Sequence, residues 1–184
     1  MEPKVINSLL ERPTNLWAYD RNLSFSQQEG SGNNWAYGFY DHGPSCSQQM
    51  LNKFRILLEK HDLVEGVLFL QSLAGGTGSG IGSYLMGLLK DEYPELSLFT
   101  SVVLPRLSGE VILQFYNCVF SLSTIYQNCD GIFFFDNDSV ERNCKKLYQI
   151  KRPNFKDMNF CLSQNLASFF FPTRSVSGYK PFEY

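Results

Sequence analysis

The chain has 184 residues, of which 43% are hydrophobic and 18% charged, a composition typical of a folded protein with a substantial core. No apolar stretch approaches the roughly twenty residues that a membrane-spanning helix requires. Sixteen basic and eighteen acidic residues give a formal net charge of −2, which supplies no electrostatic surface for a nucleic-acid backbone or an anionic membrane. We therefore expect one folding unit, residues 1–184, with neither a nucleic-acid polymer nor a membrane as partner.

Cysteine and histidine usage argues against disulfides and zinc. The five cysteines are widely spaced and show no CxxC pair, and the chain has only two histidines. We expect reduced thiols in the core of a cytoplasmic protein. The first residues also lack the basic and apolar regions of a secretory signal.

The first predicted elements are helical. Residues 5–10 suit a short helix, whereas residues 12–32 are rich in polar and turn-forming types and are expected to be a loop. Between residues 44 and 62, apolar side chains recur at helical spacing, at Met50, Phe54, Leu57 and Leu58. This pattern predicts an amphipathic helix.

Alternating strands and helices follow. An apolar run at 66–71 predicts a strand buried on both faces of a parallel sheet. A glycine-rich turn at 74–80 comes next, and it is followed by a helical apolar pattern and a second strand at 98–104. This order predicts a strand–turn–helix–strand unit.

The same alternation continues toward the end of the chain. We expect a helix over 110–128, a strand over 131–135 and a helix over 138–148 with Val140, Cys144 and Leu147 facing inward. A last helix should begin near Asn154 or Asp157, run to about Phe170 and end at Pro172. The pattern predicts an α/β fold with a mainly parallel sheet.

The turn Ala74-Gly75-Gly76-Thr77-Gly78-Ser79-Gly80 is the strongest functional signal. Glycine allows positive φ and close approach of a ligand, so the backbone amides of such a turn can converge on a phosphate. The start of the following helix would add unpaired amides, and Thr77 and Ser79 would add hydroxyl donors. The alternative is a plain tight turn, although a plain turn needs only one or two glycines.

No lysine follows these glycines, so the turn differs from the P-loop, and it also differs from the dinucleotide fingerprint GxGxxG. Residues 75–80 instead resemble the GGGTGSG signature of the tubulin family, with Ala74 in place of the first glycine. The segments 32–36 (GNNWA), 135–137 (FDN) and 152–155 (RPNF) are similar to tubulin segments in order and spacing. Residues 1–7, 31–38 and 109–112 look most like the delta branch of that family.

The resemblance covers nearly the whole chain and implies a three-layer, Rossmann-like tubulin nucleotide-binding domain that binds GTP or GDP with Mg²⁺. By this resemblance, Asn33 lies near the terminal phosphates, Glu2 near the magnesium-bound phosphate, and the phosphate chain is wrapped by Ser72, Ala74, Gly75, Gly76, Thr77 and Gly78. Taken without the resemblance, Glu2 is an ordinary solvated residue, and Asn33 is a loop asparagine that caps its own backbone.

The resemblance also implies a ribose and base site formed by Glu110, Asn137, Phe155 and Asn159. Asparagine can both donate to and accept from a purine edge, and an aromatic ring can stack on its face. Phe155 could instead be a hydrophobic staple at a helix start. Gln114 departs from the glutamate that many tubulins carry at the matching position.

No catalytic residue is assigned. Asp136 and Asp138 form a carboxylate pair in sequence, but we interpret them as a helix N-cap region. The phenylalanine clusters 133–135 and 169–171 are expected to be core, although the second could be exposed. The resemblance implies that the acid required for GTP hydrolysis comes from a segment that this chain lacks, so it would be at most a slow GTPase.

The resemblance further implies a domain truncated at both ends, without the first strand and phosphate loop of a tubulin. It suggests a cytoskeletal GTP-binding protein of centriole or basal-body triplet microtubules, as in cilia, with other tubulins or centriolar proteins as partners. The alternative is a truncated, non-hydrolysing interaction module or an incomplete gene product without a working GTP site. A free-standing NTP-hydrolysing enzyme is disfavoured because no general base or metal-ligand set accompanies the turn.

Overall fold

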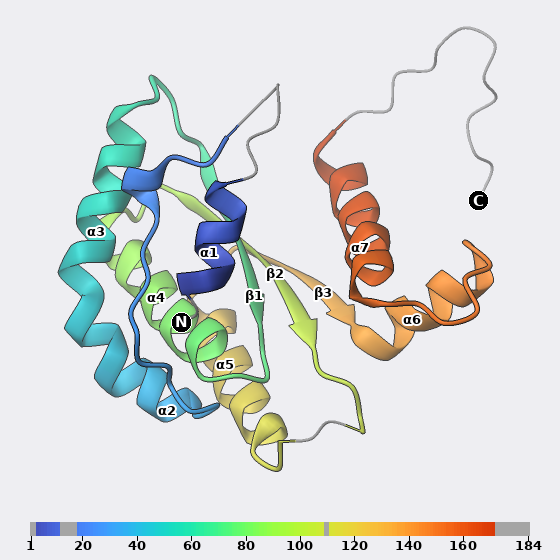
Figure 1. Ribbon diagram of the computed structural model, residues 1–184. Coiled ribbons are helices and arrows are strands. Elements are labelled where there is room, and N and C mark those ends of the chain that lie inside the picture. Colours follow the sequence, from blue (N-terminus) through green and yellow to red (C-terminus); the bar gives the residue numbers. More distant parts are fainter. Residues whose placement is uncertain (1–2, 12–17, 109–110, 172–184) are drawn as a thin grey trace, which may run out of the picture. The chain divides into compact units, whose positions relative to one another are not determined.

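The computed structural model describes residues 3–11, 18–108 and 111–171 (Figure 1). The chain divides into two compact units, residues 1–134 and 135–184. Each unit has a hydrophobic cluster of its own. Eight helices or helical turns and most of three strands lie in the described part of the first unit.

These elements of the first unit, in chain order, are α1 (Pro3–Leu10), η1 (Arg21–Leu23), α2 (Trp35–Tyr37), η2 (Gly38–His42), α3 (Gly43–Glu59), β1 (Gly66–Ser72), η3 (Thr77–Ile81), α4 (Gly82–Glu92), β2 (Ser97–Leu104), α5 (Gln114–Asn128) and β3 (Gly131–Asp136), whose last two residues belong to the second unit.

The predicted α/β fold is confirmed. Helix α3 agrees with the predicted helix over 44–62, and β2 agrees with the predicted strand over 98–104. Helix α5 begins at Gln114 rather than at residue 110.

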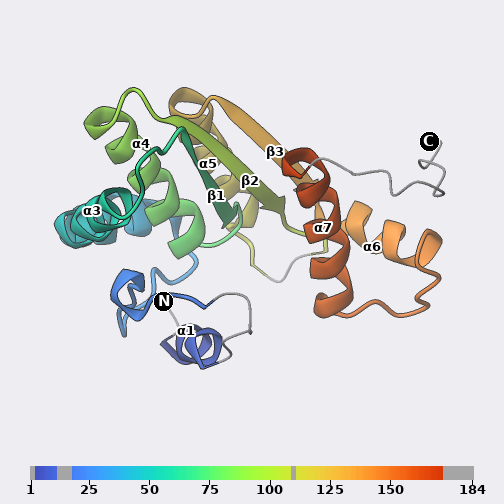
Figure 2. The same ribbon diagram turned by 90° about the horizontal axis from the view of Figure 1, so that it is seen from above.

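The sheet has the strand order β1-β2-β3, and β1 pairs with β2 in parallel, from Gly66 opposite Ser97 to Ser72 opposite Val103. Helices α3, α4 and α5 gather on one side of it (Figures 1 and 2). Met86 and Leu89 of α4 pack there with Leu98 and Val102 of β2 in one buried cluster. The core of the first unit therefore lies between one sheet face and these three helices.

Strand β1 differs from its prediction. Val67 and Phe69 pack against the core, but Leu70, on the opposite face, is 69% exposed. The expectation that this strand is buried on both faces is wrong. A short continuous apolar run has no period that would distinguish one packed face from two.

The second unit contains α6 (Asn137–Lys146) and α7 (Phe155–Phe170). Val140 and Cys144 of α6 are buried with Met158 and Cys161 of α7, whereas Leu147, expected to face inward, is 72% exposed. Leu147 follows the last residue of α6 as its C-cap, so the helical spacing no longer determines its direction. Helix α7 ends at Phe170, as predicted.

A capping box determines where α7 begins. The Asn154 side chain accepts hydrogen bonds from the amides of Lys156 and Asp157, and the Asp157 carboxylate accepts one from the Asn154 amide. Each side chain thus satisfies backbone donors that the first helical turn leaves without partners. This arrangement explains why the helix begins immediately after the RPN segment.

No described helix is both long and apolar enough to cross a membrane. The described cysteine, histidine, aspartate and glutamate side chains form no group of three or more that could hold a metal ion. All five cysteines are free thiols, and burial is the largest cause that raises the pKa of Cys46, Cys118, Cys129 and Cys144.

The two leucines that lie on opposite sheet faces test where the core is. We predict that Leu98→Ala lowers the free energy of unfolding by about 2–5 kcal/mol, because it leaves a cavity at a fully buried position. Leu70→Ala, at an exposed position of the neighbouring strand, should cost about 1 kcal/mol or less. Urea unfolding of both variants measures this difference, and equal losses would contradict the one-sided core.

Candidate functional site

The glycine-rich turn lies between β1 and a continuous helix formed by η3 and α4. Leu73, the residue after the last residue of β1, donates its amide to the Val103 carbonyl, 3.1 Å. The turn therefore leaves the sheet at the carboxyl end of β1 and enters a helix N-terminus, the position in which parallel α/β folds place ligands.

The glycines of this turn do not adopt the conformation that their residue type suggests. Gly32, outside the turn, is the one described glycine with positive φ, whereas Gly76 has a φ of −100°. Positive φ, one of the two reasons expected for these glycines, is therefore not used in the turn. Their reason is close approach, because a Cβ on Gly76 would lie 2.7 Å from both the Asn34 amide nitrogen and the Ser31 Cβ.

Two further glycines bring the same segments into contact. A Cβ on Gly38 would lie 2.2 Å from the Gly76 carbonyl oxygen, and a Cβ on Gly80 would lie 2.5 Å from the Trp35 carbonyl oxygen. Gly38 begins the π-helical turn η2, and Gly80 lies in the π-helical turn η3. The segment 31–38 and the turn thus pack backbone against backbone.

The opposite side of the turn is open. A Cβ on Gly75 would meet no atom within 4 Å, and one on Gly78 would meet only the Ser72 backbone, at 3.5 Å or more. Among the described residues, none accepts a hydrogen bond from the amides of Gly75 to Gly78. Four consecutive backbone donors are thereby left for a ligand.

The hydroxyl groups near the turn have different roles. The Ser72 Oγ accepts a hydrogen bond from the Ala74 amide, 3.3 Å, and Thr77 is half-buried at the start of η3. Ser79 is fully buried and donates its hydroxyl to the Gly75 carbonyl. The expectation that Ser79 offers its hydroxyl to a phosphate is therefore wrong, because that donor is already used within the turn.

The start of α4 is held to α5 by serines. The Ser83 hydroxyl donates to the Ser79 carbonyl and lies 3.2 Å from the Ser121 hydroxyl. Ser121 also donates to the Ser79 carbonyl, 3.4 Å. Because all three serines are fully buried, this network fixes the helix whose N-terminus faces the open side of the turn.

The Asn33 loop is a left-handed turn followed by a short helix. Gly32 and Asn33 both have positive φ, 55° and 54°. The side chain of Asn34, not that of Asn33, accepts from the amides of Ala36 and Tyr37. Asn33 therefore does not cap its own backbone. It is exposed, and its side chain makes no hydrogen bond to another described residue.

Trp35 anchors this loop. Its ring is buried, stacks on Phe39 at 4.6 Å between centroids and meets Phe120 of α5 at 5.4 Å. The aromatic contacts hold the segment 31–38 against α5 as well as against the glycine-rich turn.

Asn117 of α5 connects the two loops through its side-chain amide. Its Oδ1 accepts from the Trp35 amide at 3.0 Å, and its Nδ2 donates to the carbonyls of Asn33, 2.7 Å, and Ala74, 2.9 Å. The sequence pattern does not single out Asn117. Its partners lie 82, 84 and 43 positions away in the chain, and a lone asparagine in a helical pattern carries no signal of such contacts.

The remaining residues expected near phosphate and ribose are partly outside the described chain. Glu2 and Glu110 lie outside the described residues, so the structure tests neither. Gln114, noted as a departure, is 4% exposed and donates its amide to the Arg106 carbonyl at 3.2 Å.

The base-site residues that are described belong to the second unit. Asn137 is the first residue of α6 and is half-buried, while Phe155 and Asn159 are exposed one turn apart on α7. Their spacing of four places both on one face of that helix. Phe155 is 72% exposed and occupies the first helical position, so it is not a packed hydrophobic staple.

The sequence profile described as "Tubulin/FtsZ family, GTPase domain" matches residues 1–145. The chain belongs to the tubulin/FtsZ family. It is 41% identical over 180 residues to the tubulin delta chain of Canis lupus familiaris, covering 97% of this chain and 40% of that protein.

Other tubulins show the same partial coverage. The human tubulin delta chain is 40% identical over 178 residues, 96% of this chain and 39% of that protein. The tubulin beta-1 chain of Chondrus crispus is 30% identical over 168 residues, 91% of this chain and 37% of that protein. This tubulin-family chain thus spans about two fifths of the length of the curated relatives that it matches.

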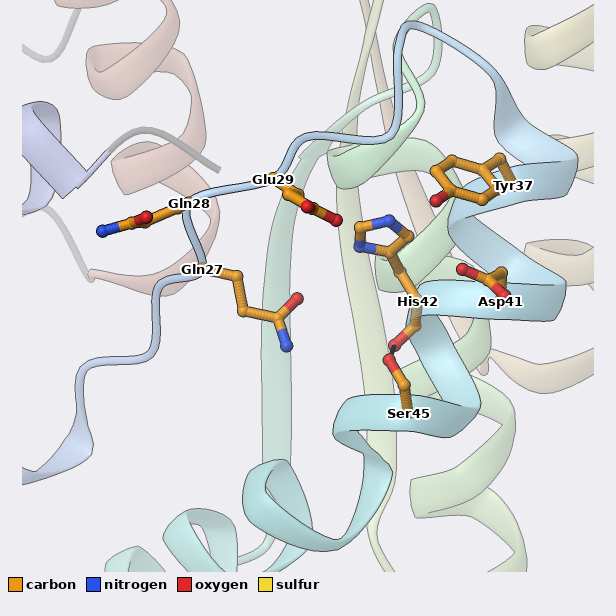
Figure 3. Close-up of a pocket in the computed structure, with 7 residues that line it drawn as sticks. All are labelled: Gln27, Gln28, Glu29, Tyr37, Asp41, His42 and Ser45. Atoms are coloured by element: carbon orange, nitrogen blue, oxygen red, sulfur yellow. Dashed lines mark hydrogen bonds between the residues drawn. The ribbon is translucent and has the colours of Figure 1, made fainter.

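This tubulin-family chain has a second, polar hollow of about 300 Å³ at the start of α3 (Figure 3). It is lined by Gln27, Gln28, Glu29, Tyr37, Asp41, His42 and Ser45. Figure 3 shows the Glu29 carboxylate directed toward the His42 imidazole, and the Tyr37 ring meets that imidazole edge-on at 4.7 Å between centroids. None of the residues expected to contact nucleotide lines this hollow.

Asp136 caps α6, which supports the N-cap interpretation. Its carboxylate accepts from the Ser139 hydroxyl, 2.6 Å, and from the amides of Asp138 and Ser139. The hydrogen bond from the Ser139 hydroxyl is the largest cause that lowers the pKa of Asp136. A carboxylate held in this way stabilises a helix N-terminus and is not placed as a general base.

The glycine contacts predict that two alanine substitutions differ in their effect on the free energy of unfolding. Gly38→Ala should lower the free energy of unfolding by about 3 kcal/mol, because its Cβ meets a backbone oxygen that cannot rotate away. Gly75→Ala, with nothing within 4 Å of its Cβ, should change that free energy by about 1 kcal/mol or less. Urea unfolding distinguishes them, and a neutral Gly38→Ala would contradict the backbone contact.

The Asp136 cap predicts a pH effect on stability. The folded chain lowers the pKa of Asp136 from 3.8. The stabilisation of the folded state by the Asp136 carboxylate is therefore fully present above pH 3.8 and is lost as the pH falls below that value. The unfolding free energy of the Asp136→Asn variant should therefore fall less than that of the wild type on acidification, by about 0.5–1 kcal/mol, since the side chain is partly exposed. Identical losses in both proteins would show that the cap does not depend on charge.

Proposed function

We propose that this chain binds guanine nucleotide as part of a delta-tubulin-like cytoskeletal protein, with its phosphates on the open side of the residue 74–78 turn. The observation that carries the proposal is the row of backbone amides from Gly75 to Gly78 without partners among the described residues, at the start of the η3–α4 helix. Such amides and the positive end of a helix dipole favour a phosphate.

A buried hydroxyl without a partner lies on the packed side of the turn, away from the proposed phosphate. Ser31 is 2% exposed, and its Oγ has no hydrogen-bond partner in the described structure. Its Cβ lies where a Cβ on Gly76 would collide with it. A buried hydroxyl without a partner costs stability, and a bound water would satisfy it.

The other contacts are proposed from the tubulin resemblance. Asn33 would reach the terminal phosphates with an exposed side chain, Ser72 and Thr77 would add polar contacts, and Glu2 would lie near a magnesium ion bound to phosphate. Mg²⁺ suits this place because it is held by few carboxylates together with phosphate oxygens. Glu110, Asn137, Phe155 and Asn159 would contact ribose and base, and the exposure of Phe155 and Asn159 is compatible with that role.

For hydrolysis, we assign no catalytic residue to this chain and propose at most a slow GTPase activity. The acid that activates water would come from a tubulin segment beyond the matched region. GTP would then act chiefly as a ligand that stabilises the native state, because it binds the folded chain and not the unfolded one.

The cellular role is proposed by similarity to delta tubulins. The chain would serve in the cytoplasmic cytoskeleton, at centrioles or at basal bodies of cilia, where it would organise triplet microtubules. Its partners would be other tubulins or centriolar proteins. The identity of 40–41% to mammalian delta chains, against 30–35% to beta chains, supports a delta-like role over a beta-tubulin role.

A nucleotide-free interaction module is the second candidate function. It is favoured by the outward side of α5, where Tyr116, Val119 and Phe120 are large apolar side chains left exposed. Exposed aromatic side chains that cluster on one helix are typical of protein contacts.

Substitution at Gly75 tests nucleotide binding. Gly75→Val should retain the stability of the wild type within about 1 kcal/mol, since its Cβ meets no protein atom, but should weaken GTP binding at least about tenfold by filling the phosphate space. Calorimetric titration with Mg·GTP, with ATP as competitor, measures the affinity. Asn159→Ala should weaken GTP selectively over ATP.

Two outcomes would decide against the proposal. A folded wild-type chain that binds no GTP would favour the interaction module. Wild-type affinity in the folded Gly75→Val variant would exclude the open side of the turn as the phosphate site.

A further inference from the structure

We infer that Asn117 is a positioning residue for the nucleotide, because its side chain sets the direction in which the Gly75 amide points. This inference rests on the proposed function and deepens it. Asn117 is not expected to touch the nucleotide.

The Asn117 side chain is buried, and its Oδ1 and both of its Nδ2 hydrogens take part in hydrogen bonds. Its Oδ1 accepts from Trp35, and its two Nδ2 hydrogens serve the carbonyls of Asn33 and Ala74. With 3% exposure it has no water-facing alternative for these bonds. Buried amides with complete hydrogen bonding specify one arrangement of the groups around them.

The planar peptide bond links the position of the Ala74 carbonyl to the direction of the Gly75 amide. The Ala74 carbonyl and the Gly75 amide belong to one trans peptide unit, in which C=O and N–H point in opposite directions. Because Asn117 holds the Ala74 carbonyl on the α5 side, the Gly75 N–H points away from α5. Gly75 is the first of the four amides that the proposed site offers to phosphate.

The same side chain joins that peptide to the Asn33 loop. Two carbonyl oxygens from separate loops repel each other unless a donor lies between them, and the Asn117 Nδ2 is that donor. Its Oδ1 at the same time holds the Trp35 amide. The residue therefore assembles both predicted phosphate loops before nucleotide arrives, which reduces the ordering cost of binding.

Asn128 on the same helix is a matched control. It is half-buried, and its Nδ2 donates to the Thr124 carbonyl one turn earlier, 2.7 Å. Asn128→Ala removes a local bond within α5, whereas Asn117→Ala removes three bonds to two loops. A general effect of asparagine removal from α5 would appear in both variants.

Hydrogen exchange of the nucleotide-free chain tests the assembly of the loops without reference to GTP. The Gly38 amide bonds to the Asn34 carbonyl, and the Gly80 amide bonds to the Gly76 carbonyl. Asn117→Ala should raise the exchange rate of both amides together by about tenfold or more relative to amides of β2, while Asn128→Ala should not. Unchanged protection of both amides in Asn117→Ala would overturn the inference.

The affinity for Mg·GTP tests the positioning role. Asn117→Asp keeps an acceptor for Trp35 but brings a carboxylate oxygen against two carbonyls. Lowering the pH from about 8 to about 5.5 favours the protonated acid, which can donate to one carbonyl again. The ratio of Asn117→Asp affinity to wild-type affinity should therefore rise several-fold as the pH falls, whereas the ratio for Asn117→Ala should stay low and constant.

The outcomes separate the two proposals. Absence of GTP binding to the folded wild type would contradict the proposed function, and hydrogen exchange would still decide whether Asn117 assembles the loops. Wild-type GTP affinity in a folded Asn117→Ala variant would overturn the positioning role while leaving GTP binding intact. If Asn117→Asp does not fold at the higher pH, the GTP affinity of Asn117→Ala alone decides whether Asn117 has the positioning role.

Discussion

Direct packing of one backbone on another constrains the whole candidate site. The segment 31–38 lies so close to the residue 74–80 turn that Gly38, Gly76 and Gly80 have no room for a Cβ. Close contact leaves these two segments little freedom to move separately, because interiors packed in this way resist small displacements. Gly75 and Gly78, which face away from the contact, are the positions where a ligand has room.

The rest of the first unit supports that contact from behind. The sheet holds the start of the turn through Leu73, buried serines fix the first turn of α4, and the α5 side chains Asn117 and Phe120 hold the segment around Trp35. Three different physical interactions thus act on two short loops. Their combined effect is to leave the free amides of Gly75 to Gly78 in one place.

Much of the fold could be predicted from local pattern. The spacing of Met50, Phe54 and Leu58 places α3, and Asn154 followed by Asp157 places the start of α7. The turn is recognisable by its glycines, but the sequence does not show which of them the protein's own backbone requires. Positive φ is a property of one residue, whereas close approach depends on a segment about forty positions earlier in the chain.

Burial, long-range partners and helix ends explain the other differences between the sequence-based expectations and the structure. Ser79 carries the same hydroxyl as Thr77, yet burial directs it to the Gly75 carbonyl. Asn117 looks like any helical asparagine until the fold brings two loops to it. Leu147 loses its inward direction because α6 ends one residue earlier. Glu2 and Glu110 lie outside the described residues and stay predictions.

The most direct test of a preassembled phosphate cradle is the response of individual backbone amides to nucleotide. In ¹H–¹⁵N NMR spectra of the chain titrated with Mg·GTP, we expect the amides of Gly75 to Gly78 to shift strongly. The amides of Gly38 and Gly80 should shift little, because each already donates to a carbonyl in the nucleotide-free chain. Strong shifts at Gly38 and Gly80 with none between Gly75 and Gly78 would contradict the account.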